Sequence, residues 1–228
     1  MDKDLKSRGI RRFALTLFAL ALLLFVPAGS LQFWPAWVFL LMMATLWGYF
    51  FIDLQRHDPQ LLERRLRSKE AERPQRILLK VFSALLYVGF IVAGLDFRFA
   101  WSRHTFGAMP TVLIAAGQLT VALGYWLVFW VMKTNSFAGS TIQIDEGQRV
   151  IETGPYAWVR HPMYLGMAIT AVAIPIALGS YVAIPAFVLI VPVLVLRLKY
   201  EEQTLHRELA GYTTYCVRTP FRLVPWVW

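Results

Sequence analysis

The sequence predicts an all-α integral membrane protein with about six transmembrane helices. Of its 228 residues 57% are hydrophobic, which is more than a typical soluble domain contains. The apolar residues form long runs, and a helix needs about 20 of them to cross a bilayer. The net charge of +9 lies in blocks between these runs, which indicates membrane topology rather than nucleic-acid binding.

Six apolar runs are candidate spans, at roughly 12–29, 35–54, 78–97, 110–132, 162–179 and 181–198. The first is preceded by basic residues, as in a signal peptide, but a second run follows at once, which favours a retained anchor. Only Gly179 and Ser180 separate the last two runs, so we expect a tight helical hairpin there. A shorter or partly re-entrant pair is the alternative.

The distribution of positive charge predicts the orientation of the chain. Of the 23 Lys and Arg residues, 21 lie at the N-terminus, in the 55–80 loop, in the 133–160 segment or in the tail from Arg197. The opposite side has only Arg98 and Arg103. Because cytoplasmic loops are enriched in Lys and Arg, we expect both termini and the 133–160 segment to be cytoplasmic.

The interiors of the predicted spans are almost free of polar residues. None has an ionisable residue near its centre, which argues against a pump or an ion-coupled transporter. Gln118 is the main polar exception, and we expect an interhelical hydrogen bond from it rather than a ligand contact. Three prolines in the last two runs are expected either to kink the helices or to be tolerated through neighbouring contacts; they are Pro175, Pro185 and Pro192.

The basic loop after the second run has a helical pattern of its own. Asp58 and Pro59 suit a helix start. Leu61, Leu62 and Leu66 share one side of that helix, while cations crowd the rest. This pattern predicts a basic helix on the membrane surface, or equally a solvated loop that only sets topology.

Metal and disulfide chemistry have little support in the sequence. Cys216 is the single cysteine, which excludes an internal disulfide and a cysteine-based metal site. The four histidines show no metal-ligand spacing. We therefore expect no metal.

The segment 154–166 combines turn residues with the start of an apolar run. Gly154 and Pro155 predict a tight turn, and Pro162 suits the first turn of a helix. Arg160 and His161 then lie just outside that helix. The free N–H groups, the helix dipole and a guanidinium together favour an anionic ligand group.

A second polar cluster follows the sixth run. Leucines at helical spacing predict that the helix continues past the membrane, carrying Glu201 and Glu202. Adjacent residues of a helix point about 100° apart, so only one of these carboxylates can face a given site. Tyr212 and Tyr215 share one helical side. Balanced surface charge and an interfacial aromatic belt are the alternatives for these residues.

Taken together, the pattern GPYxxxRHPxYxG, an apolar hairpin, EExxL, GYxxY and a following Arg resembles the isoprenylcysteine carboxyl methyltransferase family and related membrane phospholipid methyltransferases. The resemblance covers about 135–228. It divides the chain into a four-helix scaffold, 1–132, with its basic cytoplasmic loop 55–80, and a signature region, 133–228. No GxGxxG motif of a dinucleotide-binding domain is present.

The resemblance implies that S-adenosylmethionine is the methyl donor. The residues that it implies for the cofactor are Tyr156, Arg160, His161, Pro162, Tyr164, Leu165, Gly166, Glu201 and Glu202. Gly166 would permit close backbone approach to the cofactor. Tyr212, Tyr215 and Arg218 would bind the acceptor, and Arg218, Arg222 and Glu202 would act at the reacting groups. Binding of lipid phosphate is the alternative for both arginines.

By resemblance, the acceptor is the carboxylate of a prenylated cysteine, which reaches the enzyme from the surrounding membrane lipid. A phospholipid amine, a small thiol or another lipid acid stays open. The expected location is a bacterial inner membrane or the endoplasmic reticulum, with the active site on the cytoplasmic face. A nicotinamide-dependent sterol-type reductase, whose C-terminal region also carries Arg-His-Pro, and a non-catalytic membrane protein are the competing hypotheses.

Overall fold

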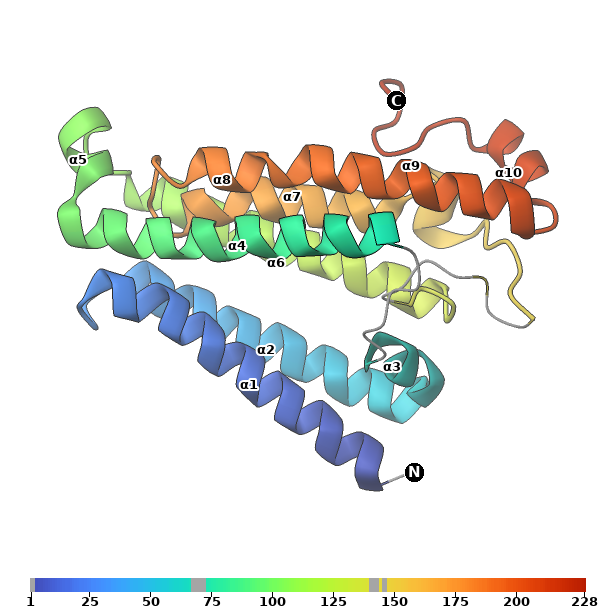
Figure 1. Ribbon diagram of the computed structural model, residues 1–228, viewed down its shortest axis with the longest axis horizontal. Coiled ribbons are helices and arrows are strands. Elements are labelled where there is room, and N and C mark those ends of the chain that lie inside the picture. Colours follow the sequence, from blue (N-terminus) through green and yellow to red (C-terminus); the bar gives the residue numbers. More distant parts are fainter. Residues whose placement is uncertain (1–2, 67–72, 140–143, 145–146) are drawn as a thin grey trace.

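The computed structural model describes residues 3–66, 73–139, 144 and 147–228. These residues form helices and no strand, as the sequence predicts (Figure 1). The helices are α1 (Lys3–Ala28), α2 (Trp34–His57), α3 (Pro59–Leu66), α4 (Arg73–Phe99), α5 (Trp101–Phe106), α6 (Thr111–Thr134), the 3-10 helix η1 (Gly154–Ala157), α7 (Pro162–Ala177), α8 (Ile184–Val188), α9 (Ile190–Glu208) and α10 (Tyr212–Arg218).

Four helices among the described residues are long and apolar enough to cross a membrane: α1 from Lys6, α2, α4 and α6. The other two predicted spans differ from the expectation. The fifth run forms α7, a shorter apolar helix of 16 residues. The sixth run is divided into α8 and α9. Pro192 has no N–H to donate to the carbonyl of Val188, and α8 ends at Val188. The predicted hairpin is present nevertheless, since α7 lies beside α8 and α9 in Figure 1.

Helices α6 and α7 approach each other closely because small residues face each other between them. A Cβ on Gly166 would lie 2.8 Å from the carbonyl oxygen of Gly124, and one on Gly117 would lie 2.6 Å from the amide nitrogen of Ala177. Gln118 links this pair to α2, since its Nε2 donates to the carbonyls of Pro35 at 3.1 Å and Ala177 at 2.9 Å. The prediction of an interhelical hydrogen bond is therefore confirmed.

A buried carboxylate ties together the end of the bundle that is remote from α3. Asp96 accepts hydrogen bonds from the backbone N–H of Ser102 at 2.7 Å, from the Ser102 hydroxyl, and from the Ser180 hydroxyl at 2.5 Å. Asp96 lies in the last turn of α4, Ser102 lies in α5 and Ser180 lies in the turn after α7. This cluster fixes the turn of the hairpin.

The helix predicted in the basic loop exists as α3, and two of its leucines, Leu61 and Leu62, are buried within the protein rather than facing the membrane surface. Leu61 and Leu62 pack in a cluster with Phe50, Phe129 and other residues of α2 and α6. The side chain of Asp58 caps the helix by accepting from the N–H of Leu61 at 2.9 Å. Helix α3 is consequently held against the same end of the bundle as η1 and the end of α9 (Figure 1).

Candidate functional site

A cavity of about 310 Å³ lies at the end of the bundle that carries α3 and η1, and we call it the polar cavity. Its walls come from α3, the start of α4, η1, the start of α7, the second half of α9, α10 and described residues of the segment between α6 and η1. Of the residues singled out in the sequence, those in the lining are Tyr156, Arg160, His161, Pro162, Tyr164, Glu201, Tyr212 and Tyr215. The fold thus brings both predicted polar clusters to one place.

The segment 154–166 has the local structure that its residues predict. Gly154 has φ of +60° and starts η1, and Pro162 lies in the first turn of α7. The backbone N–H groups of Arg160 and His161 donate to the carbonyls of Phe221 at 2.9 Å and Arg222 at 3.0 Å. The C-terminal tail therefore holds the segment in place.

Glu202 binds this segment and the tail together. It is 6% exposed, and its carboxylate lies 3.2 Å from Arg160 Nη1, 3.6 Å from His161 Nε2 and 2.7 Å from Arg222 Nε. Burial alone would raise the pKa of Glu202, but the hydrogen bonds and charges of these three partners lower it to about 2. Glu202 does not line the polar cavity.

Glu201 points to the other side of α9, as the 100° rotation between neighbours requires. It lines the polar cavity and accepts a hydrogen bond from the hydroxyl of buried Tyr164 at 2.6 Å. The two adjacent carboxylates therefore have different surroundings. Glu201 is the one that a ligand in the cavity would meet.

The tyrosines form a neutral wall. The hydroxyl of Tyr215 donates to the backbone carbonyl of Tyr156 at 2.7 Å, and the Tyr156 hydroxyl accepts from Asn135 at 3.0 Å. The hydroxyl of Tyr212 lies 3.4 Å from Nε2 of His161. Burial raises the pKa of Tyr156 to about 12 and raises those of Tyr212 and Tyr215 as well. None of the three is therefore suited to act as a base near neutral pH.

Arg65 and Arg197 also line the cavity, and sequence reasoning did not single out either of them. Arg65 comes from α3, and its Nη2 lies 3.0 Å from the sulfur of Met163. Burial lowers its pKa to about 10, so it stays charged near neutral pH. Arg197 of α9 donates to Gln75 at 3.2 Å. In the sequence both look like membrane-flanking charges, and nothing in their spacing marks them.

The buried polar atoms of the described residues include two guanidinium nitrogens without a hydrogen-bond partner, Nε of Arg65 and Nε of Arg160. Both arginines line the polar cavity. A buried donor without a partner is costly, and an anionic ligand would supply one. His161 is the N-cap residue of α7, but its ring makes no capping hydrogen bond and lies instead near Glu202 and Tyr212.

Besides Glu202, four of the predicted site residues lie outside the lining of this cavity. Leu165 packs against the hydrophobic core, and Gly166 faces Gly124, so close helix packing rather than approach to a cofactor requires its missing side chain. Arg218 is 60% exposed and pairs with Glu152 at 2.7 Å. Arg222 is engaged with Glu202.

Comparison with known proteins finds that residues 112–210 match the sequence model of the phospholipid methyltransferase family. The match runs from α6 to just beyond α9 and includes the segment 154–166 and both carboxylates. Over 97 residues the chain is also 34% identical to Delta(14)-sterol reductase TM7SF2 from Mus musculus. That alignment takes in 41% of this chain but only 23% of the reductase, so it spans about a quarter of that protein.

The structure is similar to that of the eukaryotic intramembrane Ras methyltransferase ICMT (isoprenylcysteine carboxyl methyltransferase), with a TM-score of 0.58. The alignment covers 96% of this chain and 77% of that one, at 17% sequence identity. Such similarity shows a shared fold. The chain therefore shares the fold of a multi-pass membrane protein, and the part of it that matches the phospholipid methyltransferase family model is residues 112–210.

Proposed function

We propose that this protein is an integral-membrane methyltransferase that uses S-adenosylmethionine and acts on a lipophilic acceptor. The main support for the proposal is that many residues lining the polar cavity belong to the segment that matches the phospholipid methyltransferase family model. The residues common to both include Tyr156, Arg160, His161, Tyr164 and Glu201. Function is argued here from these side chains, since a shared fold alone does not establish it.

The polar cavity fits the charges of S-adenosylmethionine. The partnerless Nε atoms of Arg65 and Arg160 suit a carboxylate. The carboxylate of Glu201 suits an ammonium group or ribose hydroxyls, and the tyrosine faces suit a sulfonium. The volume of about 310 Å³ is at the lower end of the range for small-molecule sites, about 300–1,000 Å³.

The bound cofactor would supply an electrophilic methyl group. The protein would hold the methyl donor and the acceptor in line and keep water away from them. Holding two reactants in line contributes on the order of 7–11 kcal/mol. The neutral tyrosine wall would shield the reacting groups from water, and it offers no base. A carboxylate acceptor needs none, because it is ionised near neutral pH, whereas an amine or thiol acceptor must lose a proton.

Glu202 would act as a positioning residue. Its contacts with Arg160, His161 and Arg222 fix the segment 154–166 against the tail. Arg222 would help in this clasp rather than bind the acceptor. For Arg218, which pairs with Glu152 on the surface, a role toward the acceptor requires that this pair open.

Titration calorimetry on the detergent-solubilised protein tests the proposal. We expect S-adenosylmethionine and S-adenosylhomocysteine to bind, and Glu201→Gln to weaken binding at least tenfold, because the substitution removes the charge that lines the cavity. Glu208→Gln, on the exposed last turn of α9, is the matched control. If the folded wild-type protein binds neither ligand, the proposal is refuted.

A sterol-type reductase is the second candidate, because 97 residues of this chain are 34% identical to Delta(14)-sterol reductase TM7SF2. S-adenosylmethionine and the nicotinamide cofactor both contain adenosine, so the residues that line the polar cavity do not tell which of the two it binds. Titration of reduced nicotinamide dinucleotide phosphate does. Binding of this ligand alone would favour the reductase.

We also propose that the polar cavity lies on the cytoplasmic side, from the charge distribution. Cys216, the single cysteine, lies on α10 beside the cavity and is partly exposed. A membrane-impermeant maleimide should label it in inside-out vesicles and leave it unlabelled in intact cells. The reverse pattern would place the cavity on the other side.

A further inference from the structure

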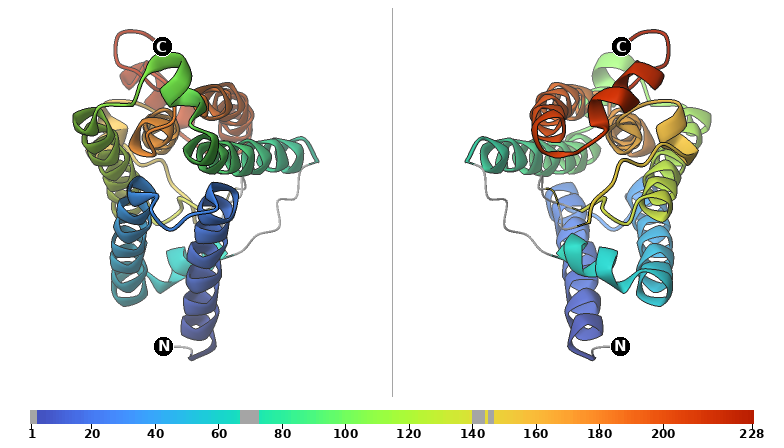
Figure 2. Two further views of the ribbon diagram at one scale, coloured as in Figure 1. Left: turned by 90° about the vertical axis from the view of Figure 1, so that its left-hand side faces the viewer. Right: turned by 90° about the vertical axis from the view of Figure 1, so that its right-hand side faces the viewer.

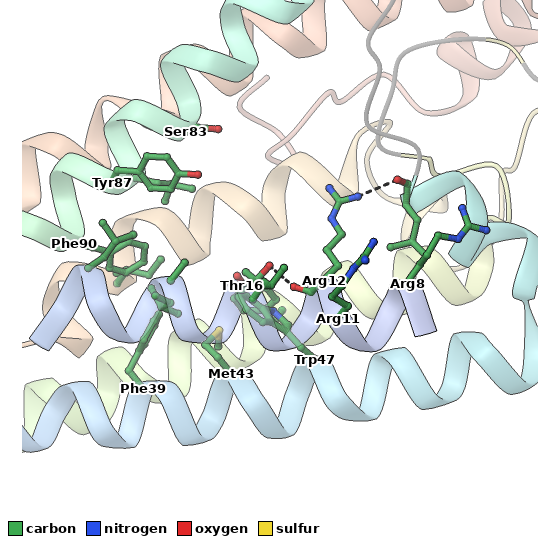
Figure 3. A pocket seen from close by; sticks show the side chains of 18 residues that line it. Arg8, Arg11, Arg12, Thr16, Phe39, Met43, Trp47, Ser83, Tyr87 and Phe90 are labelled. Atoms are coloured by element: carbon green, nitrogen blue, oxygen red, sulfur yellow. Dashed lines mark hydrogen bonds between the residues drawn. The ribbon is translucent and has the colours of Figure 1, made fainter. Parts of the chain in front are cut away.

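A second and larger cavity, of about 640 Å³, lies between α1 and α4 with α2 as its floor, and we call it the α1–α4 groove (Figure 3). Among the described residues, none lines both this groove and the polar cavity. Most of its walls are apolar, with Phe39, Met43 and Trp47 on α2 and Phe90 on α4. The family domain begins only at residue 112, so most of the groove lies outside it.

The groove results from the way that α1 and α4 diverge. The two helices touch near Gly94, where a Cβ would lie 2.5 Å from the carbonyl oxygen of Leu24 and 3.2 Å from the amide nitrogen of Ala28. From this contact they spread apart toward the end that carries α3 (Figures 1 and 2). The groove fills the resulting wedge over several turns of α1.

Charge is confined to the wide end of the groove. Figure 3 shows Arg8, Arg11 and Arg12 near one end of the cavity and Phe39 and Phe90 toward the other. No Asp or Glu is among the described residues of its lining. A long apolar channel with cations at its mouth complements an amphiphile with an anionic head and a hydrocarbon tail.

We propose that the α1–α4 groove binds an anionic phospholipid of the surrounding membrane. One acyl chain lies along α1 between Trp47 and Phe90, and the phosphate meets the three arginines. The volume falls within the range of ligand sites. Because the groove and the polar cavity have separate linings, this lipid is a resident of the fold and not the methyl acceptor, and the proposal does not rest on the proposed function.

The bound lipid would also stabilise the edge of the polar cavity. Nη1 of Arg12 donates to the carbonyl of Leu66 at 2.9 Å. Leu66 lines the groove, and its neighbour Arg65 lines the polar cavity. A phosphate at the mouth of the groove therefore lies beside the helix that supplies Arg65.

Fluorescence quenching tests the proposal, since bromine on an acyl chain quenches a tryptophan that the chain contacts. The full chain is placed in nanodiscs of zwitterionic lipid with increasing brominated phosphatidylglycerol or phosphatidylcholine. The signal of Trp47 is the difference between wild type and Trp47→Phe. We expect half-quenching at a clearly lower mole fraction of phosphatidylglycerol than of phosphatidylcholine. This lipid has neither an amine nor a carboxylate, so the result is independent of methyl transfer.

Two pairs of variants separate the groove from general effects. Replacing Arg8, Arg11 and Arg12 by Gln should raise the half-quenching mole fraction of phosphatidylglycerol about tenfold or more, since each cation near the surface contributes on the order of 1 kcal/mol. Replacing Arg73, Arg76 and Lys80 by Gln changes the net charge equally on α4, outside the lining, and should have little effect. Ala19→Phe, in the groove, should abolish quenching of Trp47, and Ala14→Phe, on another face of α1, should not.

Equal quenching by both lipids, or an equal loss in both triple variants, would overturn the proposal. So would quenching by amine-containing phospholipids but not by phosphatidylglycerol, because the groove would then be an acceptor site. Failure of the cofactor titration would refute the methyltransferase and leave this result intact.

Discussion

Replacing Glu202 by Gln tests whether this carboxylate holds the site together. The substitution keeps the shape of the side chain and removes its charge, while Arg160 and Arg222 keep theirs. The fall of the Glu202 pKa from 4.5 to about 2 corresponds to about 3 kcal/mol of stabilisation. Breaking a buried ion pair by removing one partner costs on the order of 3–5 kcal/mol, so both routes lead to a loss of about 3 kcal/mol.

The pH dependence gives the prediction its sign. A carboxyl group whose pKa is lowered on folding stabilises the protein above its unfolded pKa, and this contribution is lost as the pH falls toward the folded pKa. Between pH 4.5 and pH 3 the wild-type protein should lose stability through Glu202 at about 1.4 kcal/mol per pH unit. The Glu202→Gln variant should lack this part of the slope, so the two proteins should converge at low pH.

Equilibrium unfolding in mixed micelles, followed by tryptophan fluorescence between pH 3 and pH 7, measures both quantities. Glu208→Gln is the control, because Glu208 lies exposed at the end of α9 and pairs with its exposed neighbour Arg207. A Glu202→Gln variant as stable as wild type at pH 7 would refute the inference that Glu202 holds the segment 154–166 against the tail. So would a stability difference that does not shrink as the pH falls.

Three further predictions concern the helix contacts that support the site. Gly166→Ala should destabilise the protein by about 1–3 kcal/mol, because the new Cβ would meet the Gly124 backbone, whereas Gly48→Ala, with only an ordinary contact nearby, should not; unfolding titrations compare the two. Gln118→Leu should cost on the order of 1 kcal/mol through two lost interhelical hydrogen bonds, and the same titration with no loss would contradict this. Asp96→Ala should expose the hairpin turn, seen as faster amide hydrogen exchange around residues 180–183, and unchanged exchange there would disprove the linking role of Asp96.

Several features of the fold follow from local sequence alone. The four longest spans, the turn at Gly154 and the helix start at Pro162 depend on composition and on backbone restrictions of neighbouring residues. The sixth run shows the limit of such reasoning. Its hydropathy predicts one span, but Pro192 interrupts the backbone hydrogen bonds of the helix. The burial of Leu61 and Leu62 was not predictable either, because the same amphipathic pattern suits a membrane surface and a protein surface.

The membrane class, the segment 154–166 and the pair of carboxylates after the last apolar run could be predicted from residue order, since each is a pattern of near neighbours. Only the tertiary structure decided that Glu201 faces the polar cavity while Glu202 clasps the tail, and that Arg65 joins the site from α3. The physical reason is distance along the chain. Helices separated by loops bring Arg65 beside Met163 and Glu202 beside Arg160, and no local periodicity records which side chains meet when those helices pack.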